Sequence, residues 1–252
     1  MKSTRVIPIL LIKDDGLFKS LQFKNFKYVG DPINAVKIFN EKEVDEICIL
    51  DISATTEGRG PHIDKITEII SEAFMPLSYG GGITKLEEIK KLLYNGVEKV
   101  VLNAALHSHP NLVTEAAKVF GIQSVVASID VRKSKKGVYK IYTHNGKKEK
   151  AVDLISFAKE CENKGAGEMV INSIDRDGTG TGYDTELIQQ LAESINIPLI
   201  AVGGAWEVDH LKEAKMAGAS AVAAGSMFVF YGKHKAVLIT YPDRKTLNTI
   251  DK

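Results

Sequence analysis

Cysteine is scarce in this sequence, and no hydrophobic run is long. The two cysteines, Cys48 and Cys161, lie in apolar surroundings and form no CxxC pair. We expect free buried thiols, which excludes a disulfide framework and a dithiol redox motif. The first apolar run, 5–12, is too short to span a bilayer and lacks a small-residue cleavage site. It predicts a strand rather than a membrane span or signal peptide, and we expect a cytoplasmic protein.

The sequence also lacks the spacings of metal-binding motifs and the motif of a nucleotide-binding loop. It has no large excess of charge of one sign. The six histidines are scattered without an HExxH pattern, and there is no Walker loop or GxSxG elbow. We therefore expect no metal and no cofactor. The formal net charge is +1, which gives no reason to expect binding to nucleic acid or membranes. With 44% apolar residues in 252, residues 1–252 can form a single domain with a large core.

Short apolar runs rich in β-branched residues alternate with amphipathic stretches of helical length. Runs that are apolar from end to end are typical of parallel strands buried on both faces. The predicted strands are 5–12, 46–52, 75–80, 99–104, 124–130, 168–174, 197–203 and 221–225. The clearest helix patterns are 32–43, 85–96 and 184–195. This alternation fits either an open doubly wound sheet or a closed barrel.

An internal repeat decides between these two architectures. Residues 79–106 align with 202–228, each with a glycine pair after a strand, then a helix, a glycine turn and another strand. The same offset of about 123 residues brings Asp51 over Asp175. Two copies of a four-strand half-barrel explain both the strand number and the period. The sequence thus predicts an α/β fold, a (β/α)8 TIM barrel with a two-fold half-barrel repeat.

Two segments depart from the alternation. Residues 13–30 form a polar and aromatic connection with the length of a lid over the barrel mouth. Residues 132–150 carry eight lysines and arginines, with a hairpin predicted around Asn145-Gly146. This basic segment is interpreted either as a solvated loop or as a device that steers an anionic substrate.

Functional groups of such a barrel gather at the carboxyl ends of its strands. Two equivalent glycine loops, at 80–82 and 203–204, are each followed one strand later by a small polar residue. This pattern favours two phosphate sites on one mouth over ligand-free turns. Asp130 ends an otherwise apolar strand, so it is either a general acid or base or a cap of the next loop. For Asp51 and Asp175 we expect structural bonds to neighbouring backbone.

Several segments together resemble the cyclase subunit of imidazole glycerol phosphate synthase. They include RVIPILLIKDDG, PLSYGGGIT, ASIDVRK, AVGGA, AAGSMF and, most specifically, SIDRDGTGTGYD. In that family the barrel pairs with a glutaminase, and ammonia travels along the barrel axis to attack a bis-phosphorylated imidazole nucleotide precursor. The resemblance implies a lyase-type, cyclase-like enzyme, a glutaminase partner and a phosphorylated or nucleotide-type ligand.

Of the two aspartates that serve as general acid and base in that family, this sequence has only one. The aspartate that ends the fifth strand is Asp130, and the lid lysine is Lys19, so these two are the predicted catalytic residues. The aspartate of the first strand falls at Leu11. Asp14 and Asp15 follow in the lid and do not simply substitute for it. Losing one of two proton-transfer groups costs on the order of 10²–10⁴ in rate.

The family's phosphate-binding positions are mostly retained. The matching residues are Gly82, Asn103, Asp177, Gly178, Gly204 and Ser226. Two hydroxyls are replaced, a threonine by Ala104 and a serine by Val202. The end of the chain, 231–252, is unlike the family's last helix, and Pro242 with its β-branched surroundings predicts a shortened or rebuilt end.

At the opposite end of the barrel the family has a charged ring at the ammonia entrance. Its residues are Arg5, Glu46, Lys99 and Glu168, and all four are present. We interpret them as an ammonia gate, the alternative being a plain salt-bridge plug.

Three hypotheses follow. The first is an ammonia-conducting amidotransferase subunit that serves another acceptor, such as a nucleotide-linked sugar in surface-polysaccharide amidation, alone or with a third amidotransferase protein. The second is a genuine cyclase of histidine biosynthesis whose missing aspartate is covered by a lid residue or water. The third is a non-enzymatic allosteric scaffold for its glutaminase.

Overall fold

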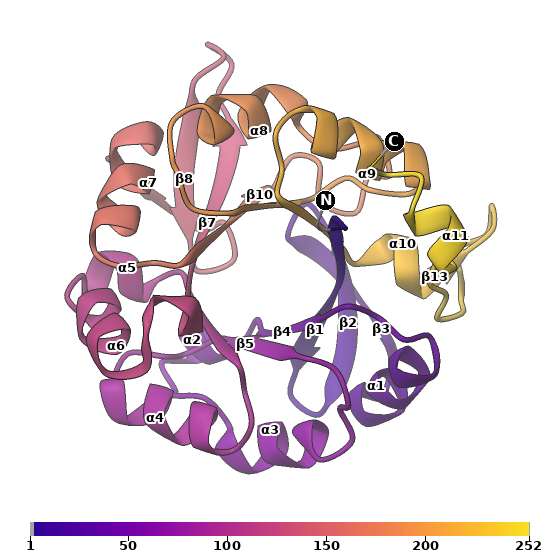
Figure 1. Cartoon of the computed structure of the whole chain (residues 1–252), viewed down its shortest axis with the longest axis horizontal. Coiled ribbons are helices and arrows are strands. Elements are labelled where there is room, and N and C mark those ends of the chain that lie inside the picture. Colours follow the sequence, from indigo (N-terminus) through magenta and orange to yellow (C-terminus); the bar gives the residue numbers. More distant parts are fainter. Residues whose placement is uncertain (1–2, 252) are drawn as a thin grey trace.

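A closed barrel of eight parallel strands forms the centre of the molecule (Figure 1), which is a computed structural model that describes residues 3–251. Every strand pairs with two neighbours, and the ring closes where β1 pairs with β12 in the register Arg5 with Ala221. The barrel strands are β1 (Arg5–Lys13), β4 (Ile47–Asp51), β5 (Leu77–Gly80), β6 (Lys99–Leu102), β7 (Val125–Lys133), β10 (Glu168–Ser173), β11 (Leu199–Val202) and β12 (Ala221–Ala224). All eight predicted strands are found, and the predicted (β/α)8 fold is confirmed.

Helices surround the barrel and connect its strands (Figure 1). Aspartates start several of them: Asp31 accepts the Asn34 N–H at the beginning of α1, and Asp184 accepts the Leu187 N–H at the beginning of α8. The longer helices are α1 (Pro32–Glu41), α3 (Ile63–Ile70), α4 (Leu86–Tyr94), α6 (Leu112–Phe120), α7 (Leu154–Asn163), α8 (Thr185–Ala192) and α9 (Val208–Met216). The short ones are α2 (Ala54–Glu57), α5 (Ala105–Ser108), α10 (Ser226–Val229), α11 (Arg244–Leu247) and the 3-10 turn η1 (Ile122–Ser124). Among residues 3–251 no helix has the length and hydrophobicity needed to cross a membrane.

Two separate apolar clusters result from the alternation of side chains along each strand. In β1, Val6, Leu10 and Ile12 point outward into the large core between barrel and helices. Ile7 and Ile9 point inward and pack with the lumen residues of the other strands, and Leu11 borders the same cluster. Leu11 therefore faces the barrel axis, as the alternation requires.

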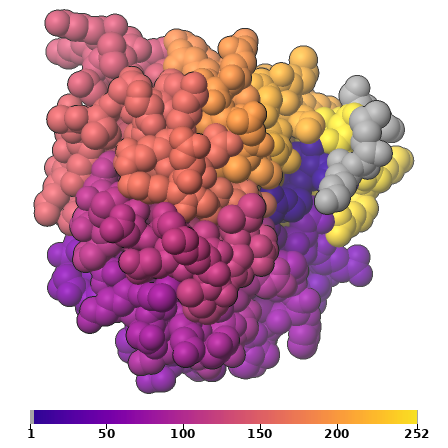
Figure 2. Space-filling view, turned by 60° about the vertical axis from the view of Figure 1, so that its left-hand side comes forward, coloured from indigo at the N-terminus to yellow at the C-terminus, as the bar shows by residue number. Residues whose placement is uncertain are grey.

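Two antiparallel hairpins extend the barrel sheet beyond its eight strands. Residues 13–30, expected as a lid connection, are ordered as β2 (Gly16–Leu21) and β3 (Lys24–Gly30), with β2 pairing back onto the end of β1. The predicted hairpin around Asn145-Gly146 is confirmed by β8 (Tyr139–Thr143) and β9 (Lys148–Lys150), which extend from β7. This basic hairpin projects from the surface at the upper left of Figure 2.

The predicted equivalence of Asp51 and Asp175 is wrong by two residues. The sheet register pairs Leu50 with Gly80 in the first half and Asn172 with Val202 in the second. Gly80 and Val202 each precede the matching glycine pair, so the half-barrel position of Asp51 is taken by Ser173. Asp175 lies beyond the end of β10, in the following loop.

The end of the chain contains a small hairpin and one short helix. A small hairpin of β13 (Phe230–Tyr231) and β14 (Ala236–Val237) follows α10, and the chain then crosses β1 to reach α11. The Tyr241 hydroxyl donates to the Val6 carbonyl over 2.8 Å, and Arg244 forms an ion pair with Asp45 at 2.6 Å. Thr4 bonds to the carboxylate of Asp251. These contacts attach the terminal segment to the amino end of the first barrel strand.

Replacing Leu247, which is 4% exposed in this terminal segment, tests whether the segment belongs to the core. We expect Leu247→Ala to lower the free energy of unfolding by about 2–4 kcal/mol, because it removes buried methyl groups and leaves a cavity. Urea denaturation measures this, with Leu238→Ala as the control because Leu238 is 52% exposed. Equal, small effects of both changes would contradict the packing described here.

Candidate functional site

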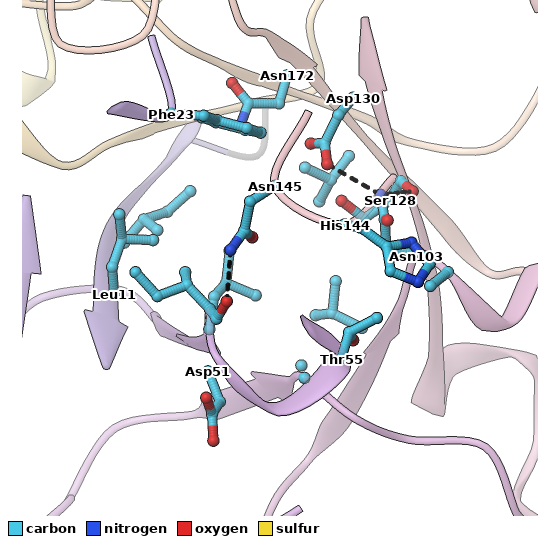
Figure 3. A pocket seen from close by; sticks show the side chains of 18 of the residues that line it. Leu11, Phe23, Asp51, Thr55, Asn103, Ser128, Asp130, His144, Asn145 and Asn172 are labelled. Carbon is cyan, nitrogen blue, oxygen red and sulfur yellow. Dashed lines mark hydrogen bonds between the residues drawn. The ribbon is translucent and has the colours of Figure 1, made fainter. Parts of the chain in front are cut away.

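A cavity of about 600 Å³ opens at the carboxyl ends of the barrel strands. It brings together residues that are far apart in the sequence, including all the predicted catalytic and phosphate-binding positions. The predicted residues in its wall are Leu11, Lys19, Gly82, Asn103, Asp130, Asp177, Gly178, Gly204 and Ser226. Figure 3 shows Leu11 and Asp130 on opposite sides of this mouth.

Asp130 is the acidic group of the mouth that is best placed to exchange a proton. It lies in β7, which continues three residues beyond the predicted strand end. Asn103 donates from Nδ2 to the Asp130 carboxylate over 3.1 Å and to the Ser128 carbonyl over 2.9 Å (Figure 3). Burial, with the charge of Asp177 as a smaller cause, raises the pKa of Asp130 to about 7. A carboxyl group with this pKa can act as acid or base near neutral pH.

Lys19 points from β2 down into the mouth and is buried. Its Nζ donates to the carbonyl of Ile9 over 2.5 Å. Burial lowers the pKa of Lys19 to about 8, although the nearby Asp177 opposes this change. The lysine is therefore part of the cavity wall and can lose its proton more easily than an exposed lysine.

Asp177 fastens the lid hairpin to the loop after β10. Its Oδ2 accepts the Ser20 hydroxyl over 2.7 Å and the backbone N–H of Phe23 at 3.3 Å. Its carbonyl accepts the N–H of Gln22 over 2.9 Å. Burial raises the pKa of Asp177, while these hydrogen bonds and Lys19 favour the charged form. Asp177, a predicted phosphate-site residue, therefore holds the β2–β3 hairpin against the loop after β10.

The close packing of the two loops requires glycine at these positions, whether or not a ligand binds there. Gly82 has φ +69°, and a Cβ there would lie 2.5 Å from the carbonyl oxygen of Arg59. Gly204 has φ +109°, and a Cβ there would lie 2.0 Å from the carbonyl oxygen of Gly182. Both loops thus pass directly against another loop of the mouth, where no side chain fits.

Asp51 has the structural role that the sequence suggested. It accepts the backbone N–H groups of Ser53 and Ala54, each at 3.0 Å, and forms an ion pair with Arg59 at 2.9 Å. Asp175 likewise accepts a backbone N–H, from Lys133, over 2.8 Å. Both carboxylates hold loops of the mouth in place.

The four charged residues at the opposite end form a closed ring. Arg5 bonds to Glu46 and to Glu168, each at 2.6 Å, and Lys99 bonds to the same two carboxylates, each at 3.0 Å. Burial lowers the pKa of Arg5, and the two carboxylates more than offset this and raise it overall. Each charge therefore has two partners of opposite sign, and the ring lies across the amino end of the lumen.

Comparison with known proteins agrees with this geometry. The family model for histidine biosynthesis proteins matches residues 5–235. This chain belongs to the histidine biosynthesis protein family. Two curated relatives are both named "putative imidazole glycerol phosphate synthase subunit": hisF2 of Pseudomonas aeruginosa and hisF3 of Vibrio vulnificus. The first is 47% identical over 98% of this chain and 99% of its own length, the second 47% identical over 96% and 94%. The imidazole glycerol phosphate synthase subunit HisF of Exiguobacterium sibiricum is 39% identical over 97% of this chain and 96% of its own.

Several mouth residues of this HisF-like chain were not predicted from its sequence. Asn145 donates from Nδ2 to the Ile52 carbonyl over 2.6 Å and so connects the β8–β9 turn to the loop after β4 (Figure 3). Ser20 and Phe23 join loops in the same way through the distant Asp177, whereas Arg59 pairs with Asp51, eight residues away. A lone polar residue in a loop gives no signal of such a partner. Among residues 3–251, no group of three metal-ligating side chains is close enough to hold a metal ion.

The raised pKa of Asp130 predicts a pH-dependent effect of Asp130→Asn on stability. The unfolded carboxyl has a pKa of about 3.9, whereas the folded one titrates near pH 7. Asp130 thus favours folding fully below about pH 4, and this contribution is lost as pH rises through 7. We expect Asp130→Asn to gain stability relative to the wild type between pH 4 and 8, measured by urea denaturation. Asp15→Asn, at an exposed lid position, is the control; a pH-independent difference for both variants would refute the buried carboxyl.

Proposed function

We propose that this chain is the synthase subunit of a glutamine amidotransferase, which receives ammonia from a glutaminase partner and delivers it to an anionic acceptor in the mouth. The observation that carries this proposal is a succession of two cavities along the lumen between the charged ring and the mouth. A small cavity of about 20 Å³ lies just above Glu46, among lumen side chains. Ile9, Val101 and Val170 line both this cavity and the mouth.

The chemistry of the path supports ammonia as the molecule conducted. The lumen side chains, among them Ile7, Val126 and Ala223, are apolar. Neutral ammonia crosses apolar surroundings at a modest cost, whereas ammonium would lose its hydration without compensation. The ring of four charges closes the lower end, so entry requires a rearrangement there, for which the docked glutaminase is the natural cause.

The mouth supports an acceptor that carries phosphate. One cavity is surrounded by the loops at Gly82 and Gly204 and by Asn103, Gly178 and Ser226. A phosphorylated or nucleotide-type ligand would bind between the two loops. Asp130 is then the group that gives or takes the proton, and Lys19 supplies positive charge beside the bound ligand. Among residues 3–251, Leu11 and not a second acid occupies the side of the cavity opposite Asp130 (Figure 3).

This difference points to an acceptor other than the histidine precursor. An apolar side chain at Leu11 cannot transfer a proton, and a two-group acid–base mechanism loses about 10²–10⁴ in rate without one partner. We include in the proposal a nucleotide-linked sugar of surface-glycan synthesis as the eventual acceptor, which receives the ammonia directly or through a third amidotransferase protein.

The second candidate function is cyclisation in histidine biosynthesis. The retained cavity residues and the name of the Exiguobacterium sibiricum relative favour it. In this case water or a lid group would replace the missing aspartate. Cyclase turnover of the histidine precursor distinguishes the two candidates.

Cyclase turnover with ammonium salt should be absent or at least about 100-fold below that of a complete acid–base pair in the wild type. Leu11→Asp restores a carboxyl group opposite Asp130, and we expect it to raise turnover by about 10²-fold or more. Leu11→Asn is the matched control, because it adds polarity without a titratable group. Normal turnover by the wild type, with no gain in Leu11→Asp, would identify an ordinary cyclase.

Narrowing the lumen tests the ammonia path. In the Leu11→Asp background we expect Ala223→Leu to reduce glutamine-dependent product formation about 10-fold and leave ammonium-dependent formation within two-fold, because Ala223 lines the small cavity. Both rates are measured with the glutaminase partner present, and thermal denaturation checks folding. Equal glutamine-dependent rates with and without the leucine would favour an allosteric scaffold.

A further inference from the structure

Arg132 is the exception among the arginines of this chain. The sequence has five, and four of them bind carboxylates or carbonyl groups: Arg5, Arg59, Arg176 and Arg244. Arg132 has no ion pair within 4.0 Å among residues 3–251, and its Nε is buried without a hydrogen-bond partner. A guanidinium offers five N–H donors. The donors of Arg132 that the protein does not use are available to a ligand.

Arg132 lies beside the mouth, next to Phe23 and the β8–β9 turn, rather than among the residues that line its cavity. It lies in β7 two residues after Asp130, hence on the same face of the strand and about 7 Å further along it. In the register of β7 and β8, Asp130 is opposite Tyr142 and Arg132 is opposite Lys140. The guanidinium therefore stands above the proton-transfer group, toward the opening of the barrel.

Neighbouring side chains hold the guanidinium from both sides. Its Cζ lies 5.4 Å from the centre of the Tyr142 ring, an arrangement that favours a cation. On the other side, a Cβ on Gly146 would lie 3.1 Å from Arg132 Nη2 and 3.4 Å from the ring of Phe23. Phe23 and Asn145, the neighbour of Gly146, both line the mouth cavity. Arg132 is thus fixed between the lid tip and the β8–β9 turn.

The acidic groups nearest to this place have other partners. Glu149 accepts the Tyr142 hydroxyl over 3.0 Å and pairs with Lys140 at 3.7 Å. Asp175 accepts the backbone N–H of Lys133. Lys140, opposite Arg132 in the register, is paired with Glu149, so the charge of Arg132 is the one at this place that residues 3–251 leave without an ion pair.

We infer that Arg132 binds an oxyanion of the acceptor, a phosphate or a carboxylate, at a third anion subsite beyond the two glycine loops. The inference rests on the proposed function, in which the mouth takes an anionic acceptor. A planar guanidinium fork matches phosphate and carboxylate geometry and binds either of them bidentately. The acceptor accordingly carries one more anionic group than the glycine loops require, as a nucleoside diphosphate or a carboxylated sugar would.

Calorimetric titration of the full chain with inorganic pyrophosphate, and separately with malonate, tests this subsite. We expect Arg132→Gln to weaken binding about 10-fold or more, and Arg132→Lys to have an intermediate effect because it keeps the charge and loses the fork. Lys135→Gln, at an exposed position of the same hairpin, should remain within two-fold of the wild type. An effect on pyrophosphate alone assigns a phosphate, and an effect on malonate alone assigns a carboxylate.

The outcomes separate this inference from the proposed function. If Ser226→Ala weakens pyrophosphate binding and Arg132→Gln leaves both anions within two-fold, the mouth binds phosphate and the third subsite is wrong. If the wild type binds neither anion, the anionic acceptor fails and the subsite fails with it. Thermal denaturation gives a further readout: a binding arginine with an unpartnered Nε can be replaced without loss of melting temperature. A clear decrease in Arg132→Gln would show a structural arginine and overturn the inference.

Discussion

Closure of the barrel at the β1–β12 pair is the constraint on which the mouth and the lumen depend. Once Arg5–Pro8 pairs with Ala221–Ala224, every barrel strand has two neighbours and no barrel edge remains open. All strands are parallel, so their carboxyl ends meet on one face. The closing strand contributes Ala221 and Ala223 to the lumen, and these small side chains leave room beside Ile7 and Ile9. The same closure places Leu11 across the cavity from Asp130.

The barrel could be predicted because its signals are periodic and repeated. Apolar runs, helix patterns and the half-barrel repeat all depend on residues near one another in sequence, and glycine pairs such as Gly203-Gly204 mark matching loops. The offset of about 123 residues, however, comes from the alignment of glycine loops in 79–106 and 202–228 and not from the register of the strands. Alignment of loops tolerates an insertion, whereas strand register does not, and the register gives the position of Asp51 to Ser173.

The contacts that organise the mouth could not be predicted in the same way. Ser20 and Asp177 are 157 positions apart, and Asn145 and Ile52 are separated by 93. These hydrogen bonds connect segments that lie far apart in the chain, and nothing in the local sequence of either segment requires the other. Such bonds follow from the closed barrel, which brings the loops together, and they can be found only once the loops have been placed in space.

The two ends of the barrel differ in how freely their residues can change. In the ring, removal of Glu168 would leave both Arg5 and Lys99 with one carboxylate in place of two, and a part-buried charge that loses its partner is strongly destabilising. At the mouth, Leu11 packs beside the lumen cluster and leaves no polar partner unpaired. A change from a carboxylate to leucine there alters the chemistry without a comparable penalty. The pairing of charges therefore restricts changes in the ring, whereas a change at Leu11 alters the chemistry of the mouth and little else.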